Sequence, residues 1–293
     1  MIAVTGANGQ LGRLVVKGLL ERMQANQIIA AVRDPEQAQA LRSLGVEIRK
    51  ADYDRPETLQ KAFQDVERLL LISAVVPGER LRQHQAVIEA AKKAGVNFIA
   101  YTSMLRAETS DLVLAAEHKA TEEYVRDSGM GFALLRNGWY FENHTASLKT
   151  ALEHGVIIGA AGEGRFASAS RADYAGAAVA VLTEPGHDNM TYELAGDKGF
   201  TLHELAAEVT KQAGAPVTYR NLTPLEYEAA LLGFGLPKMI VEVVVDADMK
   251  AQHGSLDSSS RDLSRLLGRP TTSLSEAVAS GLRPLSTQPA SGK

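Results

Sequence analysis

The chain has 293 residues, of which 45% are hydrophobic and 23% are charged, with a net charge of −4 and no cysteine. This length accommodates one large domain, or one domain with a smaller partner. The negative charge argues against a nucleic-acid partner, and the lack of cysteine excludes disulfides, thiolate catalysis and iron–sulfur ligation.

No apolar run approaches the length of a membrane span. The chain also starts directly on a predicted strand, so we expect no signal peptide before the fold. A cysteine-free chain suits a reducing compartment. We therefore expect a soluble cytoplasmic protein with no membrane partner.

The first predicted unit is a strand over residues 1–5, then Gly6-Ala-Asn-Gly-Gln-Leu-Gly12, then a helix. In a dinucleotide-binding unit the first glycine allows a sharp turn, the second lets the backbone approach phosphate, and the third lets the helix pack on the strand. The helix N-terminus offers N–H groups and a positive dipole end. We expect the pyrophosphate to contact the residues of this turn, namely Gly6, Asn8, Gly9, Gln10, Leu11 and Gly12.

Apolar strands and helices then alternate through the first half of the chain. Predicted strands cover residues 28–32, 46–48, 68–72, 98–102 and 132–136, and predicted helices cover residues 35–44, 56–63, 79–94 and 116–128. This alternation predicts an α/β fold, a Rossmann-type doubly wound parallel sheet. Ligands of such sheets bind beyond the carboxyl ends of the strands. Candidate contacts there are Arg33, Asp52, Ser73, Ala74, Thr102 and Asn137.

Beyond residue 136 the alternation is less regular. We expect a helix over residues 143–155, a loop over 159–164, an alanine-rich helix over 174–182 and a strand over 192–194 that returns to the sheet. Further predicted elements are a helix over 205–213, a strand over 217–220 and helices over 224–232 and 239–245. Capping boxes are predicted at Ser170 with Asp173 and at Thr201 with Glu204.

These elements suggest two domains and a tail. The predicted dinucleotide-binding domain covers residues 1–140, with 165–195 returning to it. The predicted smaller α/β part, which would bind the substrate, covers 141–164 and 196–285. Residues 286–293 have the composition of a disordered tail.

The end of the second strand indicates which dinucleotide is preferred. An acid at this position accepts hydrogen bonds from the ribose 2′-hydroxyl, whereas a cation favours a 2′-phosphate. Arg33 can pair with phosphate through a bidentate fork, which favours NADPH. Two alternatives remain open: Asp34 faces the ribose instead, or Arg33 is only a solvated loop cation.

Four segments together resemble one family. The GxxGxxG turn in residues 4–12, Val-Arg-Asp-Pro at 32–35, Arg-Asn-Gly-Trp-Tyr at 136–140 and Ser-Arg-Ala-Asp-Tyr at 170–174 are similar to NmrA-like atypical short-chain dehydrogenase/reductases. Within that group the chain most resembles bacterial NADPH-dependent quinone reductases and triarylmethane dye reductases. The similarity extends to about residue 285, and its most specific part is the segment 136–143.

The usual catalytic pair of short-chain dehydrogenases is missing. None of the eight tyrosines is followed four residues later by lysine, which argues against an alcohol dehydrogenase or a sugar epimerase. A quinone needs less help, because it is a strong hydride acceptor and positioning beside the nicotinamide supplies much of the acceleration. The leading hypothesis is therefore NADPH-dependent hydride transfer to a quinone or a similar conjugated acceptor.

Several side chains are candidates for completing the protonation. They are His118, Lys119, Tyr140 and Asn143, of which Lys119 and Tyr140 are the predicted catalytic residues. The family resemblance implies that Lys119 falls near a catalytic or ribose-binding lysine, and that Tyr140 and Asn143 line the cofactor and substrate pocket. The plainer alternatives are a solvated helix face for Lys119, an ordinary helix histidine for His118 and core packing for the segment 139–141. Met104 and residues 231–245 form either an apolar wall for a flat ring or simple core.

Two other functions remain open. NmrA-like proteins include regulators that bind the dinucleotide and perform no chemistry, and the missing catalytic pair is compatible with that role. A reductase of bulkier aromatics, such as dyes or phenolic ethers, is the third reading. The seven histidines show no metal-ligand spacing, so we expect no metal. The expected partner is a small aromatic or quinone substrate, and a homodimer is compatible with the sequence.

Overall fold

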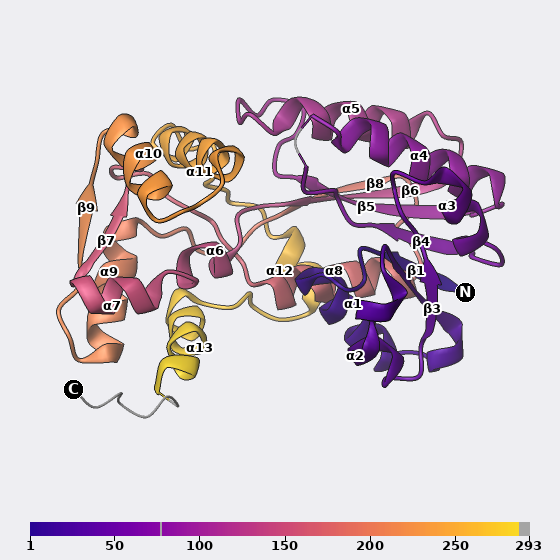
Figure 1. The fold of residues 1–293 in the computed structure, drawn as a ribbon, viewed down its shortest axis with the longest axis horizontal. Helices are drawn as coiled ribbons and strands as arrows, with labels where there is room; N and C mark the ends of the chain where they lie inside the picture. Colours follow the sequence, from indigo (N-terminus) through magenta and orange to yellow (C-terminus); the bar gives the residue numbers. More distant parts are fainter. Residues whose placement is uncertain (77, 287–293) are drawn as a thin grey trace.

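The computed structural model describes residues 1–76 and 78–286, and its main feature is a seven-stranded parallel sheet. The strand order is β3-β2-β1-β4-β5-β6-β8 (Figure 1). The order reverses between β1 and β4, the kind of switch point where open α/β sheets bind ligands. The predicted Rossmann-type doubly wound fold is thereby confirmed. The strands are β1 (Ile2–Thr5), β2 (Ile28–Val32), β3 (Glu47–Lys50), β4 (Arg68–Leu71), β5 (Phe98–Met104), β6 (Gly131–Asn137) and β8 (Met190–Leu194).

Helices cover both faces of this sheet because successive side chains of each strand point to opposite sides. Val4 and its equivalents pack against α1, α2, α8 and α12, whereas Ala3 and its equivalents pack against α3, α4 and α5 (Figure 1). The helices of the first face are α1 (Gln10–Leu20), α2 (Gln39–Arg42), α8 (Arg171–Thr183) and α12 (Asp262–Leu267). Those of the second face are α3 (Pro56–Ala62), α4 (Arg80–Lys93) and α5 (Ala115–Arg126).

The alanine-rich α8 lies against α1 with little space between them. A Cβ atom on Gly18 of α1 would lie 2.9 Å from Cγ2 of Val179 in α8. The lack of a side chain at Gly18 of α1 therefore lets the two helices approach closely at this contact. This packing and the pairing of β8 with β6 join the segment 165–195 to the sheet.

A second, smaller group of elements lies at the end of the molecule opposite the N-terminus (Figure 1). Its two strands, β7 (Val156–Gly159) and β9 (Thr218–Asn221), pair in parallel. Phe166, Phe200 and Val209 belong to its core. Its helices are α6 (Phe141–Thr145), α7 (Leu148–His154), α9 (Leu202–Ala213), α10 (Pro224–Gly233), α11 (Lys238–Ala251) and α13 (Leu274–Ser286).

The structure corrects several expected elements. The predicted helix over residues 35–44 is split into a 3-10 turn, η2 (Pro35–Gln37), and α2, because Ala38 leaves helical geometry at φ −98° and ψ 25°. The predicted helix over residues 143–155 is likewise two helices, α6 and α7, which are separated at Ser147. β7, α12, α13 and the 3-10 turn η1 (Ala25–Gln27) were not predicted. Both predicted capping boxes are confirmed, as are the strands near residues 192–194 and 217–220.

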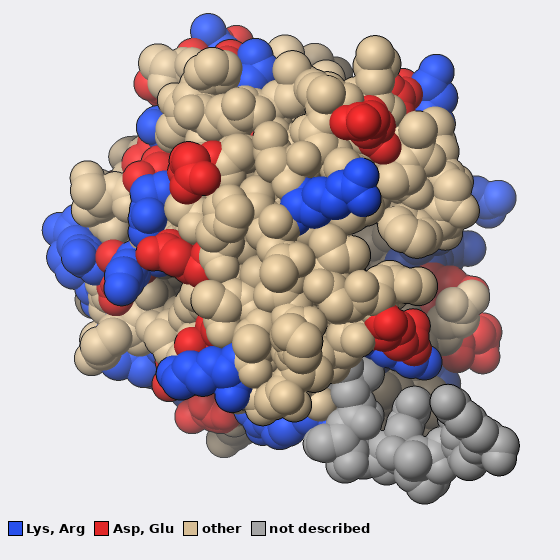
Figure 2. Space-filling view, turned by 90° about the vertical axis from the view of Figure 1, so that its left-hand side faces the viewer, with Lys and Arg blue, Asp and Glu red and all other residues tan. Residues whose placement is uncertain are grey.

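The predicted tail begins at Ser286, which is the last residue of α13, and residues 287–293 lie outside the described part of the chain. No helix within the described ranges has both the length and the apolar character needed to cross a membrane. Figure 2 shows the face that carries the smaller group of elements. On this face basic and acidic side chains are interspersed around a broad uncharged centre.

Candidate active site

The glycine turn after β1 has the geometry of a phosphate cradle. Gly6 adopts the left-handed conformation, at φ +57°, and its carbonyl oxygen accepts a hydrogen bond from the Gly9 N–H at 2.9 Å. A Cβ atom on Gly12 would lie 2.5 Å from the Gly6 oxygen and 2.6 Å from the Ala7 Cα. Only a residue without a side chain fits there, because the obstacles are backbone atoms.

The N-terminus of α1 is open to an anion. No side chain caps this helix end, its first turn holds no acid, and its first helical hydrogen bond runs from the Arg13 N–H to the Gly9 oxygen. The N–H groups of Gln10, Leu11 and Gly12, which precede that bond, therefore remain available as donors at the positive end of the helix dipole. Gln10 is exposed at this end, whereas the Leu11 side chain is buried in the core.

Asn8 braces the turn. Its Nδ2 donates to the Gln37 carbonyl oxygen at 3.1 Å, and its Oδ1 accepts two hydrogen bonds from the Arg13 guanidinium. The glycine turn is thereby tied both to its own helix and to the segment after β2.

The two residues that follow β2, Arg33 and Asp34, have different surroundings. The Asp34 carboxylate accepts hydrogen bonds from the Glu36 N–H at 3.0 Å and from Gln37 Nε2 at 2.9 Å, which cap η2. Arg33 is exposed at the strand end. Since Asp34 is engaged in local capping, Arg33 is the better placed of the two to meet a group on the ribose.

Asp52 and Ser73 follow the next two strands. Asp52 is half-buried, and its carboxylate accepts the Asp54 N–H at 3.1 Å and lies 3.9 Å from the Arg55 guanidinium. The Ser73 N–H donates to Thr102 Oγ1 at 2.8 Å. Both residues therefore lie at the carboxyl edge of the sheet, as the sequence predicts.

Buried histidines hold the Ala74 backbone. The Ala74 N–H donates to His84 Nε2 at 2.8 Å, so the His84 proton sits on Nδ1, next to Thr121 Oγ1 at 3.1 Å. Burial lowers the pKa of His84 to about 3 and also lowers that of His118, which contacts the Tyr101 hydroxyl at 2.7 Å. His118 is thus a neutral side chain in a buried network, in line with the plainer of its two readings.

The end of β6 carries an unsatisfied polar atom. Asn137 is 8% exposed, and its Oδ1 has no hydrogen-bond partner among the described residues, while its Nδ2 lies 3.4 Å from the Tyr140 hydroxyl. A buried acceptor without a donor costs about 1–3 kcal/mol. Such an atom is expected where a ligand supplies the missing donor.

Tyr140 packs between two side chains of α8. Its ring centroid lies 5.0 Å from that of Tyr174 and 4.9 Å from the Arg171 guanidinium carbon. Burial raises its pKa, which makes its hydroxyl a weaker acid. Arg171 also donates to Asn143 Oδ1 at 3.3 Å, so Tyr140 and Asn143 share one partner.

Lys119 lies apart from this group. It is exposed on α5 and does not line the cavity described below. Met104 does not line the cavity either, and instead packs against the core of the smaller part.

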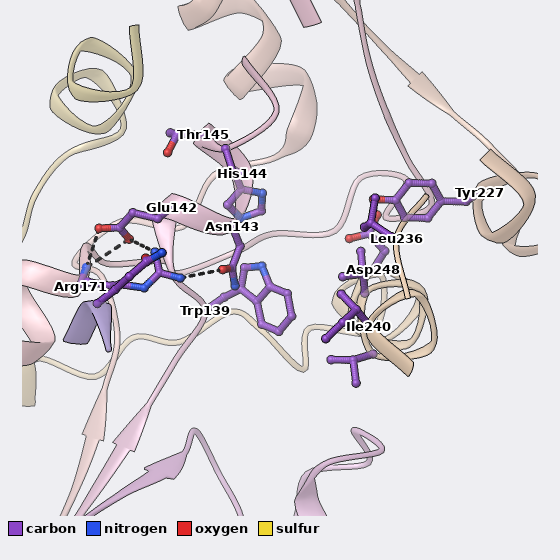
Figure 3. Close-up of a pocket in the computed structure, with 14 residues that line it drawn as sticks. Trp139, Glu142, Asn143, His144, Thr145, Arg171, Tyr227, Leu236, Ile240 and Asp248 are labelled. Carbon is purple, nitrogen blue, oxygen red and sulfur yellow. Dashed lines mark hydrogen bonds and ion pairs between the residues drawn. The ribbon is translucent and has the colours of Figure 1, made fainter. Parts of the chain in front are cut away.

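A cavity of about 630 Å³ extends from the glycine turn to α11 (Figure 3). Figure 3 shows Glu142 and Arg171 at one end, and Trp139 between that end and the group formed by Tyr227, Leu236, Ile240 and Asp248. Gln10 of the glycine turn also lines the cavity. Asn143, His144, Thr145, Ala146, Val243 and Val244 complete the lining. Of the predicted cofactor contacts, the cavity brings together Gln10 and Asn143.

The sequence analysis missed part of this lining. Tyr227 and Asp248 were not singled out, and for Trp139 the sequence left open either core packing or a place in the pocket that the family resemblance implies. The apolar run within residues 231–245 was the available signal, since Leu236, Ile240, Val243 and Val244 form one wall of the cavity. The described residues hold no group of three or more His, Asp and Glu side chains that could bind a metal ion.

The chain matches known proteins over nearly its whole length. A model of an NAD(P)H-binding family matches residues 6–185. Quinone oxidoreductase 2 of Escherichia coli (strain K12) is 54% identical over 279 residues, which cover 95% of this chain and 98% of that protein.

Two solved structures agree with the fold. The E. coli NADPH-dependent quinone oxidoreductase in complex with NADPH has a TM-score of 0.93 at 54% identity, and the match covers 96% of this chain and 99% of that one. Triphenylmethane reductase of Citrobacter sp. in complex with NADP(H) has a TM-score of 0.93 at 39% identity, with 96% of this chain and 100% of that one covered. This chain therefore belongs to the NAD(P)H-binding, NmrA-like family.

Proposed function

We propose that this protein is an NADPH-dependent oxidoreductase that transfers hydride to a quinone or a similar conjugated acceptor. The observation that carries the proposal is one continuous cavity, which is lined by Gln10 of the glycine turn, by Trp139 and by an apolar wall. A dinucleotide site that opens directly into a cavity of this size suits a reaction between cofactor and substrate. The 54% identity to a quinone oxidoreductase supports the same acceptor class.

The residues of the site fit NADPH. The Gly12 backbone contact leaves room for a close phosphate, the N-terminus of α1 offers donors, and Asn137 Oδ1 awaits a donor such as the nicotinamide carboxamide. We assign the pyrophosphate to the turn from Gly6 to Gly12 and the 2′-phosphate to Arg33. The further contacts in this proposal are Asp52, Ser73 and Ala74 on the adenosine side, and Asn137, Tyr140 and Asn143 on the nicotinamide side.

The main contribution of the chain is to position the acceptor beside the cofactor and to exclude water from the cavity. Bound NADPH supplies the hydride. Trp139, Leu236 and Ile240 offer apolar surface to a flat ring, which orients the acceptor without a covalent step. Lys119 and Tyr140 remain predicted catalytic residues; Tyr140 is the better positioned of the two, since it follows β6 beside Asn137.

Two structural assignments belong to the same proposal. We assign dinucleotide binding to residues 1–140 together with 165–195, and substrate binding to 141–164 together with 196–285. The packing of α8 on α1 and of β8 on β6 supports this division. A cytoplasmic location and a homodimer are also proposed, and light scattering of the purified protein tests the oligomeric state.

An NADPH-oxidation screen tests the function. Purified protein is offered quinones, triarylmethane dyes and aldehydes, with NADH in place of NADPH as a control. We expect rapid oxidation of NADPH with quinones and none with simple aldehydes. Tight binding of NADP(H) without turnover of any acceptor would instead favour a redox-sensing regulator, and preference for dyes over quinones would favour a reductase of bulkier aromatics.

A further inference from the structure

A buried carboxyl group lies in the wall of the cavity at its end farthest from the glycine turn. Asp248 of α11 is 6% exposed, and its Oδ2 accepts the Ala160 N–H at 2.8 Å. A Cβ atom on Gly159 would lie 2.8 Å from the same oxygen, so a glycine leaves the space that the carboxyl occupies. Within residues 1–76 and 78–286, Oδ1 has no hydrogen-bond partner.

The surroundings of this carboxyl are largely apolar. Figure 3 shows Leu236 and Ile240 beside it. Val244, one helical turn before Asp248 on α11, lines the same cavity and packs in the same cluster as Leu236. The titratable groups that face Asp248 from neighbouring elements are Tyr219 of β9 and Tyr227 of α10. Burial raises the pKa of Tyr219 to about 12 and also raises the pKa of Tyr227, so both stay neutral at physiological pH.

The charged groups at the opposite end of the cavity and on α11 itself have other partners than Asp248. At the opposite end of the cavity Glu142 is paired with Arg171 at 3.6 Å, and burial lowers the pKa of His144 to about 4. On α11 itself Lys250 pairs with Asp111 at 2.9 Å, and Asp246 accepts the Val113 N–H at 2.8 Å.

Without a cation beside it, Asp248 resists ionisation. Burial raises its pKa to about 7, and the opposing hydrogen bond from the Ala160 N–H is the smaller influence. A large share of the group is therefore a carboxylic acid near neutral pH, when it can donate a proton.

We propose that Asp248 is the proton donor to the reduced acceptor, acting on an oxygen atom at the α11 end of the cavity. This assignment rests on the proposed quinone reduction. When bound NADPH supplies a hydride to the oxygen at the nicotinamide end of a 1,4-quinone, its C–H bond breaks and an O–H bond forms at that oxygen, while an electron pair moves through the ring onto the opposite oxygen. The O–H bond of Asp248 breaks as the O–H bond of the hydroquinone forms, and solvent then returns a proton to the carboxylate. The sum is quinone, NADPH and one proton giving hydroquinone and NADP⁺.

This arrangement accounts for the missing Tyr-x-x-x-Lys pair. In a simple ketone the oxygen that needs the proton is bonded to the carbon that receives the hydride, so donor and nicotinamide must be adjacent. In a 1,4-quinone the two oxygens lie at opposite ends of the ring. A donor on α11 and a hydride source beyond β6 can therefore act on the same molecule from two sides.

The test compares Asp248→Asn with Glu242→Gln, using NADPH and 1,4-naphthoquinone across the range pH 5 to 9. Asparagine preserves the acceptor for the Ala160 N–H but cannot transfer a proton. Glu242 lies on the same helix, is 57% exposed and does not line the cavity, so its variant controls for loss of an acid from α11. We expect wild-type and Glu242→Gln kcat to fall above about pH 7. Asp248→Asn should lower kcat about a hundredfold at pH 6, lose this pH dependence and leave KM nearly unchanged.

A second measurement reports on the cavity without turnover. Trp139 is the single tryptophan of the chain and lines the cavity, so quenching of its fluorescence by the quinone reports binding. We expect equal quinone affinity in wild type and Asp248→Asn. The Asp248 carboxyl, identified as the ¹³C resonance missing from the variant, should titrate near pH 7.

Three results would overturn the inference. They are an unchanged rate and pH profile in Asp248→Asn, a carboxyl that titrates near its ordinary value, and a loss of rate that is equal at every pH and is matched by weaker quenching of Trp139. The last would make Asp248 a wall residue only. If the wild-type protein reduces no quinone at all, the proposed function itself fails, which is a separate outcome.

Discussion

The two ends of the cavity are built in different ways. At one end the glycine turn, seven residues long, offers backbone atoms to a ligand: the obstacles around Gly12 are the Gly6 oxygen and the Ala7 Cα. At the other end the surface consists of side chains, among them Tyr227 of α10 and Asp248 of α11, which Trp139 of the segment between β6 and α6 faces. The first end is specified by neighbours in sequence, whereas the second depends on packing between distant segments.

Because of this difference, the two ends of the cavity tolerate amino-acid substitutions to different degrees. A cradle made of backbone tolerates few substitutions, because a side chain added to it collides with atoms that cannot move independently. A wall made of side chains can be altered one residue at a time. We therefore expect variants of the glycine turn to act on NADPH alone, and variants of α11 to act on the acceptor.

Substitution of Gly12 should have the largest effect. In Gly12→Val the new side chain overlaps the Gly6 oxygen and the Ala7 Cα, so the turn must move away from its phosphate-binding geometry. We expect NADPH affinity to fall at least about a hundredfold, or about 3 kcal/mol, in isothermal titration calorimetry. Quenching of Trp139 by a quinone should persist, because the acceptor end is built separately.

Gly233→Ala is the matched control for this variant. Gly233 lies in the last turn of α10, and a Cβ atom there would meet nothing within 4 Å. Affinity for NADPH should be unchanged, and stability should rise by about 0.5–1 kcal/mol. Normal NADPH affinity in Gly12→Val would contradict the claim that the glycine turn binds the cofactor and the α11 end binds the acceptor.

The ionisation of Asp248 should make the free energy of unfolding depend on pH. The pKa of Asp248 is about 7 in the folded protein and 3.8 as the ordinary value, so between these pH values the folded state binds more protons than the unfolded state. Wild-type stability is therefore lost as the pH rises through this window. Asp248→Asn removes the dependence, so its free energy of unfolding relative to wild type should rise by about 3 kcal/mol between pH 5 and pH 8.

Urea unfolding at several pH values measures this difference. Glu242→Gln serves again as the control and should follow the wild-type curve, because Glu242 is exposed. A constant difference between Asp248→Asn and wild type across the range would mean that the carboxyl ionises normally in the folded state.

The same contrast explains how far the sequence could be interpreted. The glycine turn, the strands of the main sheet and the capping boxes depend on residues close together in the chain, and each was predicted. β7 was not, because it is a four-residue strand whose sheet partner within the described part of the chain, β9, begins about sixty residues later. The helix expected over residues 35–44 failed for a local reason, the departure of Ala38 from helical geometry between η2 and α2.

The cavity wall was the least predictable part. Trp139 lies in the segment that the family resemblance implies at the pocket, but its residue type and position after an apolar strand left core packing open as an alternative. Asp248 is one of two aspartates near the end of α11, and only the packing of β7 and α10 around it separates the buried one from Asp246. Residues whose roles depend on such long-range packing cannot be assigned from spacing alone.

Arg33 should affect the choice of dinucleotide by a smaller amount. In Arg33→Ala a charge-assisted contact to the 2′-phosphate is lost, so NADPH affinity should fall about thirtyfold while NADH affinity stays the same. Arg22→Ala is the control, since Arg22 is also exposed but pairs with Glu184 at 3.3 Å, away from the strand ends. Equal losses for NADPH and NADH would assign Arg33 a general electrostatic role.

Asn137, at the end of β6, should give the smallest effect on NADPH affinity, together with an opposite effect on stability. Its buried Oδ1 has no donor among residues 1–76 and 78–286, so Asn137→Leu removes an unsatisfied acceptor at the cost of one long hydrogen bond to Tyr140. The free energy of unfolding without ligand should therefore rise by about 1 kcal/mol, whereas NADPH affinity should fall about fivefold because the cofactor loses its acceptor.

Asn97→Ala, at an exposed position just before β5, should change neither quantity. Thermal unfolding with and without NADPH measures both at once, and a variant that is destabilised in both states would show that Asn137 supports the fold and not the cofactor.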